Sequence, residues 1–125
     1  MRTPVATSAG METLPTIDLA GFDAIARAPG VTLLDFGAEH CAPCRAMVPV
    51  LAALAREYGA RVRVVAVDCD REPALAERFL VRSMPTFVVW RDGREVGRIV
   101  GSRPRAFVAG VLDRALAGDV AIAAP

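Results

Sequence analysis

Apolar runs along the chain predict strands that lie in the interior of a sheet. Residues 31–36 are apolar except for Thr32 and Asp35. A near-continuous apolar run of this length is typical of a strand that is buried on both faces. Residues 62–67 form the next predicted strand.

Residues 43–58 instead repeat their apolar side chains with the period of a helix. The repeating positions are Met47, Val50, Leu51, Leu54 and Tyr58. Gly59 is expected to end this helix, because glycine readily adopts the conformation found at helix ends. Pro49 lies inside the helix and is expected to bend it, because it removes one hydrogen bond and crowds the preceding turn.

Cap and turn residues mark the remaining elements. Asp18 and Ser102 are expected to cap the first and last helices. Asp92 and Gly93 can both adopt positive φ angles, which predicts a hairpin turn. Pro73 fits the first turn of a short helix. The predicted elements are helices over 18–28, 43–58, 70–79 and from 102 onward, and strands over 31–36, 62–67, 86–90 and 95–100.

This order of elements predicts an α/β sandwich with helices on both faces of a mixed sheet. The early alternation of helix and strand favours parallel strands joined by right-handed crossovers. The hairpin adds antiparallel pairing at one edge. The chain has 125 residues, which fits one domain. We expect this domain over residues 14–117, with a disordered extension over 1–13 and a frayed tail over 118–125.

Composition excludes several classes of partner. The chain has 15 basic and 14 acidic residues and a net charge of +1, which gives no electrostatic reason to expect nucleic acid or an anionic membrane. The apolar run over 46–55 is ten residues long, whereas a membrane span needs about 20. Three cysteines are too few for a secreted disulfide framework. Without a signal-peptide pattern, the expected location is cytoplasmic.

The chemistry of the chain is expected at Cys41-Ala42-Pro43-Cys44, which follows a predicted buried strand and opens a helix. Cysteines three residues apart at a helix start can come within bonding distance of each other. The helix dipole and its unpaired N–H groups stabilise a thiolate at Cys41, and such cysteines have pKa values of about 3.5–7.5. Cys41 is therefore expected to attack a disulfide and Cys44 to resolve the mixed disulfide. The alternative is a pair of ordinary buried cysteines.

Two segments carry a family resemblance. The segment LLDFGAEHCAPCRAMVP resembles the active-site segment of the thioredoxin family, and SMPTF resembles its cis-proline loop. The turn at Asp92-Gly93 and the position of Gly101 match the spacing of that family. The resemblance implies a thioredoxin fold, a three-layer α/β/α sandwich with a central mixed sheet. It also implies a redox-active disulfide between Cys41 and Cys44.

The resemblance assigns further roles. Asp35, whose pKa should be raised by burial, would take the proton of Cys44 through water; otherwise its carboxylate reaches solvent at the strand end. Pro85 would follow a cis peptide bond, where the alternative is a trans proline that starts an edge strand. Met84 would offer its backbone to an extended client. The residues implied to contact substrate are His40, Ala42, Pro43, Met84, Pro85 and Gly101.

Four positions depart from the family pattern. His40 replaces the usual Trp, Gly37 a common bulky aromatic residue, Ala42 the usual Gly and Ala66 a frequent Lys. A protonated His40 would stabilise the Cys41 thiolate; the alternative is an exposed loop residue with little effect. Cys69 is either a regulatory thiol or a small buried hydrophobic residue.

The leading hypothesis is a monomeric thiol–disulfide oxidoreductase that reduces protein disulfides. The sequence lacks a G-x-G-x-x-G nucleotide motif, so no cofactor is expected. Electrons would come by dithiol exchange with a flavin-containing thioredoxin reductase. One alternative is a binding or holdase module with weak redox activity. Another is a zinc site formed by His40, Cys41, Cys44 and Cys69, although structural zinc sites usually contain a second paired motif.

Overall fold

Four strands form one mixed sheet in the order β2-β1-β3-β4. The computed structural model describes residues 14–118, so the predicted extension over 1–13 and most of the predicted tail lie outside the described residues. The strands are β1 (Val31–Gly37), β2 (Val62–Asp68), β3 (Thr86–Arg91) and β4 (Arg94–Val100). The helices are α1 (Leu19–Arg27), α2 (Ala42–Tyr58), α3 (Pro73–Arg78) and α4 (Arg105–Leu116).

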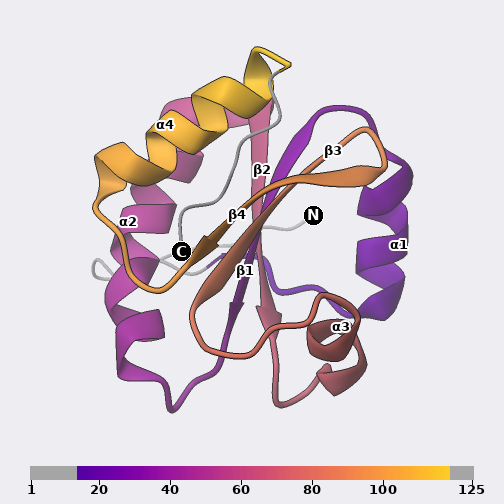
Figure 1. The fold of residues 1–125 in the computed structure, drawn as a ribbon, viewed down its shortest axis with the longest axis vertical. Coiled ribbons are helices and arrows are strands. Elements are labelled where there is room, and N and C mark those ends of the chain that lie inside the picture. Colours follow the sequence, from indigo (N-terminus) through magenta and orange to yellow (C-terminus); the bar gives the residue numbers. More distant parts are fainter. Residues whose placement is uncertain (1–13, 119–125) are drawn as a thin grey trace.

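Strand β1 lies inside the sheet. It pairs in parallel with β2 and antiparallel with β3, and all seven of its residues are buried. Helices α2 and α4 cover one face of the sheet, and α1 and α3 cover the other (Figure 1). This is the predicted α/β sandwich.

The two faces of the sheet build two separate apolar cores. Because side chains alternate along a strand, Val31 and Leu33 pack under α2 and α4, whereas Leu34 and Phe36 pack against α1 and α3. Asp35 has the same parity as Val31 and Leu33. Its carboxyl group is therefore expected on the face that α2 covers.

Local signals end most elements as expected. The Asp18 carboxylate caps α1 by accepting a hydrogen bond from the Gly21 N–H at 2.9 Å. Gly59 ends α2 at a φ of 55°. Asp92 and Gly93 both have positive φ angles, 51° and 86°, in the tight turn between β3 and β4.

Two helix starts differ from the prediction. The last helix begins at Arg105 after Pro104, and Ser102 does not cap it. A residue before proline is disfavoured in the helical region, so Arg103 cannot extend the helix back toward Ser102. Helix α3 begins at Pro73 rather than at residue 70. The preceding residues instead form a turn in which the Asp68 carboxylate accepts from the N–H of Asp70 at 2.9 Å.

Helix α3 ends in a Schellman motif, in which two N–H groups bond back into the last turn. The N–H of Val81 donates to the carbonyl of Ala76, and that of Leu80 donates to Glu77, both at 2.9 Å. This motif places Leu80 at a φ of 55° with 62% of its surface exposed. Glycine usually fills that position, because a side chain is strained there.

Leu80→Gly is therefore expected to stabilise the protein by about 0.5–1 kcal/mol. Removing the side chain relieves about 1–2 kcal/mol of backbone strain, and the greater freedom of glycine in the unfolded chain offsets about 0.5–1 kcal/mol of it. Urea unfolding measures the difference. Leu80→Ala is the control, because it removes the exposed side chain but keeps the strained Cβ. A gain equal to that of glycine in Leu80→Ala would contradict the strain argument.

Candidate active site

Four chain segments meet at one end of the sheet. In the strand register, Phe36 lies beside Thr86, which lies beside Val100, and Gly37 pairs with Asp68 on β2. The end of β1, the start of β3 and the ends of β2 and β4 therefore share one edge. Because α2 follows β1 after a short loop, its first turn also lies there.

The predicted dithiol occupies the start of α2. Cys41 is the N-cap residue of the helix, and it forms a disulfide with Cys44, with 5.2 Å between their Cα atoms. The Cys44 N–H donates a hydrogen bond to Cys41 Sγ at 3.2 Å. Cys41 is partly exposed, whereas Cys44 is only 6% exposed. One sulfur can therefore be reached by a large partner, and the other lies beneath it.

The position of Cys41 favours its negatively charged form once the disulfide is reduced. The N–H groups of the first helical turn have no helical partners and the helix dipole is positive there. A thiolate is a stronger hydrogen-bond acceptor than a disulfide sulfur, so the contact from Cys44 N–H strengthens on reduction. Cys41 thus has the environment of a reactive cysteine.

Asp35 is buried next to Cys44. It is 6% exposed, and its Oδ1 atom has no hydrogen-bond partner among residues 14–118. Burial raises the pKa of this carboxyl from 3.8 to about 7, as the sequence predicted. Ala66 pairs directly with Asp35 across β1 and β2, so its short side chain brings no cation to counter the raised pKa.

A cavity of about 560 Å³ opens beside these two residues. The sequence did not predict this cavity. It did show small residues at positions 37 and 66, where the thioredoxin family was expected to have larger ones. A Cβ on Gly37 would lie 3.1 Å from Cys44 Sγ and 3.8 Å from Asp35 Oδ1. The lining residues include Asp35, Gly37, Glu39, Cys44, Arg45, Ala66 and Asp68.

The segment before β3 lies on another side of the site. The peptide bond between Met84 and Pro85 is cis. Pro85 is buried and Met84 is half-buried. The Gly101 N–H donates to the Pro85 carbonyl at 2.8 Å, and Gly101 has a φ of 87°. The structure thus joins two of the predicted contact segments, which are far apart in the sequence.

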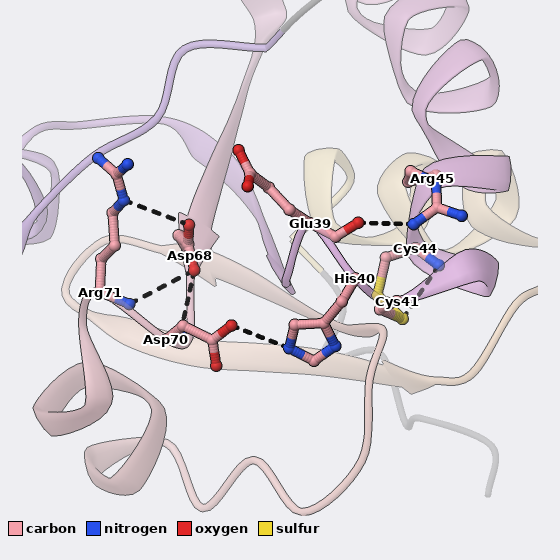
Figure 2. Close-up of polar contacts among 8 residues, drawn as sticks. All are labelled: Glu39, His40, Cys41, Cys44, Arg45, Asp68, Asp70 and Arg71. Carbon is pink, nitrogen blue, oxygen red and sulfur yellow. Dashed lines mark hydrogen bonds and ion pairs between the residues drawn. A yellow bond between two sulfur atoms is a disulfide. The ribbon is translucent and has the colours of Figure 1, made fainter.

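The remaining predicted contact residues form an exposed rim. His40, Ala42 and Pro43 are all exposed. Figure 2 shows the imidazole of His40 directed toward Asp70, with 2.9 Å between Nε2 and Oδ2. Sequence reasoning missed Asp70, because the two residues are 30 positions apart and only the loop after β2 brings them together.

Cys69 lies in the same loop and is partly exposed. Burial and the nearby carboxylates of Asp68 and Asp70 raise the pKa of its thiol to about 11. Because the thiolate is the reactive form, this environment favours the interpretation of Cys69 as a small, unreactive side chain.

Neither a metal site nor a membrane span is found in the described part of the chain. Between residues 14 and 118, no three His, Cys, Asp or Glu side chains are grouped to hold a metal ion. The four-ligand zinc alternative therefore has no geometric support. No helix over the same residues is long and apolar enough to cross a membrane.

Comparison with known proteins agrees with this geometry. The thioredoxin family model matches residues 13–114. A thioredoxin of Staphylococcus haemolyticus is 41% identical over 87 residues, which cover 70% of this chain and 84% of that protein. A thioredoxin of Staphylococcus aureus is 40% identical over the same lengths.

Solved structures show the same similarity. Mitochondrial thioredoxin 3 of Saccharomyces cerevisiae, in its oxidised form, superposes with a TM-score of 0.73 at 35% identity, covering 80% of this chain and 94% of that one. Plasmodium falciparum thioredoxin superposes with a TM-score of 0.75 at 25% identity, covering 81% and 98%.

An α/β sandwich with a disulfide at the start of its second helix and a buried acid beside it defines a thiol–disulfide oxidoreductase. The chain belongs to the thioredoxin family. Within that family, the disulfide favours redox chemistry over a module that only binds partners.

Asp35→Asn is expected to change how stability depends on pH. The folded-state pKa of about 7 lies above the value of 3.8 taken for the unfolded chain. Between these values the native state keeps a proton that the unfolded chain releases, so wild-type stability falls as pH rises. The fall is about 1.4 kcal/mol per pH unit and about 4 kcal/mol in all, and it ends above pH 7.

Urea unfolding of the oxidised proteins from pH 4 to pH 9 measures this effect. The unfolding free energy of Asp35→Asn relative to wild type should rise up to about pH 7 and then level off. Asp23→Asn removes an exposed carboxylate of α1 and serves as the control. A difference between Asp35→Asn and wild type that does not vary with pH would contradict the raised pKa.

Proposed function

We propose that the domain over residues 14–117 reduces disulfide bonds in client proteins. The observation that carries this proposal is the Cys41–Cys44 disulfide, with one sulfur accessible at a helix N-terminus and the other buried beside an acid. This asymmetry gives the two cysteines different tasks. The accessible sulfur meets the client, and the buried one completes the exchange.

In the proposed reaction, the Cys41 thiolate attacks one sulfur of the client disulfide. A mixed disulfide forms and the other client sulfur leaves as a thiolate. Cys44 then loses its proton and attacks Cys41 Sγ, which releases the reduced client and forms the Cys41–Cys44 disulfide. Asp35, with a pKa of about 7, receives the Cys44 proton through water in the adjoining cavity.

The exposed rim and the segment before β3 supply the proposed client contacts. His40, Ala42 and Pro43 present the surface beside the disulfide. Met84 offers backbone groups to an extended client strand, in the manner of strand addition. Pro85 shapes the groove, and Gly101, bonded to its carbonyl, completes the wall.

The oxidised protein must be reduced again by a second dithiol. We assign this step to a flavin-containing thioredoxin reductase, on the strength of the family membership. The proposed setting is the cytoplasm, where a reducing thiol pool sustains such exchange. The proposed acting form is a monomer that carries no cofactor of its own.

Reduction of insulin by dithiothreitol tests the proposed activity. Wild-type protein should accelerate the reaction, and Cys41→Ser should lower the rate to that of dithiothreitol alone, because the attacking sulfur is gone. Cys44→Ser, reduced beforehand and then incubated with insulin without dithiothreitol, should instead accumulate a mixed disulfide that mass spectrometry detects. Cys69→Ser is the matched control and should retain the wild-type rate. Equal rates with and without wild-type protein would support a holdase instead.

His40→Trp is expected to change the reduction potential by less than about 30 mV, or about 1.4 kcal/mol. The Asp70 carboxylate lies 2.9 Å from His40 and offsets the charge of a protonated imidazole. Both side chains are also well exposed, so solvent weakens their effect on Cys41. Equilibration with glutathione measures the potential, and a larger shift would show that His40 tunes the thiolate. A wild-type value near −270 mV is typical of a reductase and one near −120 mV of an oxidant.

A further inference from the structure

The cavity beside α2 is lined in part by Cys44, whose sulfur would stay covered in thiol exchange at the exposed rim. Cys44 lines it together with Asp35, whose Oδ1 atom is buried and has no partner within residues 14–118. Most of its wall is apolar, and it opens to solvent. At about 560 Å³, it falls in the range of small-molecule sites.

The missing side chain of Gly37 leaves Cys44 uncovered on the side of the cavity. A single Cβ at this position would lie 3.1 Å from Cys44 Sγ and 3.2 Å from Cys44 Cβ, closer than ordinary van der Waals contact. Ala66 lines the same cavity from β2. Two short residues therefore leave open a path to the buried sulfur that longer side chains would block.

The chemistry of the disulfide favours attack at that sulfur. A thiol that attacks Cys41 expels Cys44, on which negative charge develops in a buried environment until Asp35 returns a proton. A thiol that attacks Cys44 expels Cys41, whose thiolate accepts the hydrogen bond from Cys44 N–H and lies at the positive end of α2. The more acidic thiol is the better leaving group, so the chemistry favours attack on Cys44. The main obstacle to that attack is the burial of Cys44.

We propose that small neutral or cationic thiols reduce the Cys41–Cys44 disulfide through this cavity, by direct attack on Cys44. The thiolate forms a bond to Cys44 Sγ while the S–S bond breaks and Cys41 leaves as a thiolate. A second thiol attacks the small-molecule sulfur of the mixed disulfide, so Cys44 is released and takes up a proton. Two thiols are oxidised to one disulfide. The protein gains two electrons and, with Cys41 left as the thiolate, one proton, while the second proton goes to solvent.

This inference rests on the proposed function, because it assumes that the disulfide is reduced and re-formed during the work of the protein. It adds a second electron source, a low-molecular-weight thiol, to the protein reductase. Access to Cys44 also separates the two routes by size, since a protein partner can contact only the exposed rim near Cys41.

The charges of the cavity select the class of thiol. Asp35, Glu39 and Asp68 bring three carboxyl groups to its lining, and Asp35 is ionised above about pH 7. Two cations face them, because Arg45 lines the cavity and Arg71 lies 3.8 Å from Asp68. Arg45 already donates a hydrogen bond to the Glu39 carbonyl at 2.6 Å (Figure 2). The excess of negative charge disfavours a thiol that carries a carboxylate and favours a neutral or positively charged one.

Three thiols of similar size test the proposal: 2-aminoethanethiol, 2-mercaptoethanol and 3-mercaptopropionate. Rates of reduction of the oxidised protein are followed by acid quenching, alkylation and mass spectrometry. Each rate is divided by the rate of the same thiol with 2-hydroxyethyl disulfide, which corrects for differences in nucleophilicity. The corrected rate for 3-mercaptopropionate should be at least tenfold below the other two.

Two variants narrow the cavity. Gly37→Ala places a methyl group over Cys44 Sγ, and Ala66→Leu fills the space from β2; each should slow the neutral and cationic thiols at least tenfold. Gly110→Ala is the matched control, since a Cβ there meets nothing within 4 Å, and it should keep the wild-type rates. Circular dichroism checks that each variant is folded. If Gly37→Ala does not fold, the rates of Ala66→Leu test the proposal.

Single-cysteine variants locate the attack. In Cys41→Ser, reaction of Cys44 with 2-hydroxyethyl disulfide should slow when Gly37→Ala is added, whereas in Cys44→Ser the reaction of Cys41 should not change. Unchanged rates in the folded cavity variants, or equal slowing at both cysteines, would overturn the proposal. The insulin assay with wild-type protein distinguishes failure of this proposal from failure of the proposed function. If wild type reduces insulin but the cavity tests fail, only the small-thiol route is wrong. If wild type does not reduce insulin, the proposed function is wrong.

Discussion

The chemistry of this protein depends on the placement of Cys41 as the residue at which α2 begins. That position leaves one sulfur partly exposed among unpaired N–H groups and puts the second sulfur one turn further on, inside the protein. The same hydrogen bond from Cys44 N–H to Cys41 Sγ that caps the helix also stabilises a negative charge on Cys41. Helix geometry therefore gives two chemically identical side chains different exposure and different electrostatic surroundings.

Burying Asp35 costs stability and leaves a carboxyl group that titrates near pH 7 beside Cys44. A carboxyl group in the interior of β1 without a hydrogen-bond partner for Oδ1 is held close to neutrality by its raised pKa. A group that titrates near pH 7 can accept and return protons in the cell. The surrounding sheet is apolar on both faces, and the burial of those side chains offsets the unfavourable carboxyl group.

Small and polar side chains surround the disulfide. Gly37 and Ala66 line a cavity next to the buried Cys44, and the exposed His40, paired with Asp70, makes the rim polar. The fold tolerates these residues because the two apolar cores lie on either side of the sheet and do not require bulky residues at its edge. Contacts and access can thus vary while the scaffold is kept.

Local features of the sequence determined the elements and the dithiol. Apolar periodicity, the Asp18 cap, the Asp92-Gly93 turn and the spacing of Cys41 and Cys44 act over a few residues, so they could be read in advance. The Ser102 cap and the start of α3 were predicted wrongly, because a neighbouring proline or a carboxylate in the turn changed the first helical residue. The sequence also placed antiparallel pairing only at the hairpin edge, whereas β1 pairs antiparallel with β3 inside the sheet.

Tertiary structure decided how those elements meet. The contact of His40 with Asp70, the bond between Gly101 and Pro85, and the cavity shared by Cys44, Asp35 and Ala66 join residues from separate strands and loops. Contacts of this kind depend on strand order and register, which bring together positions such as 85 and 101, which are 16 residues apart, and 40 and 70, which are 30 apart. The sequence therefore determined which groups react, and the packed sheet determined what surrounds them and what can reach them.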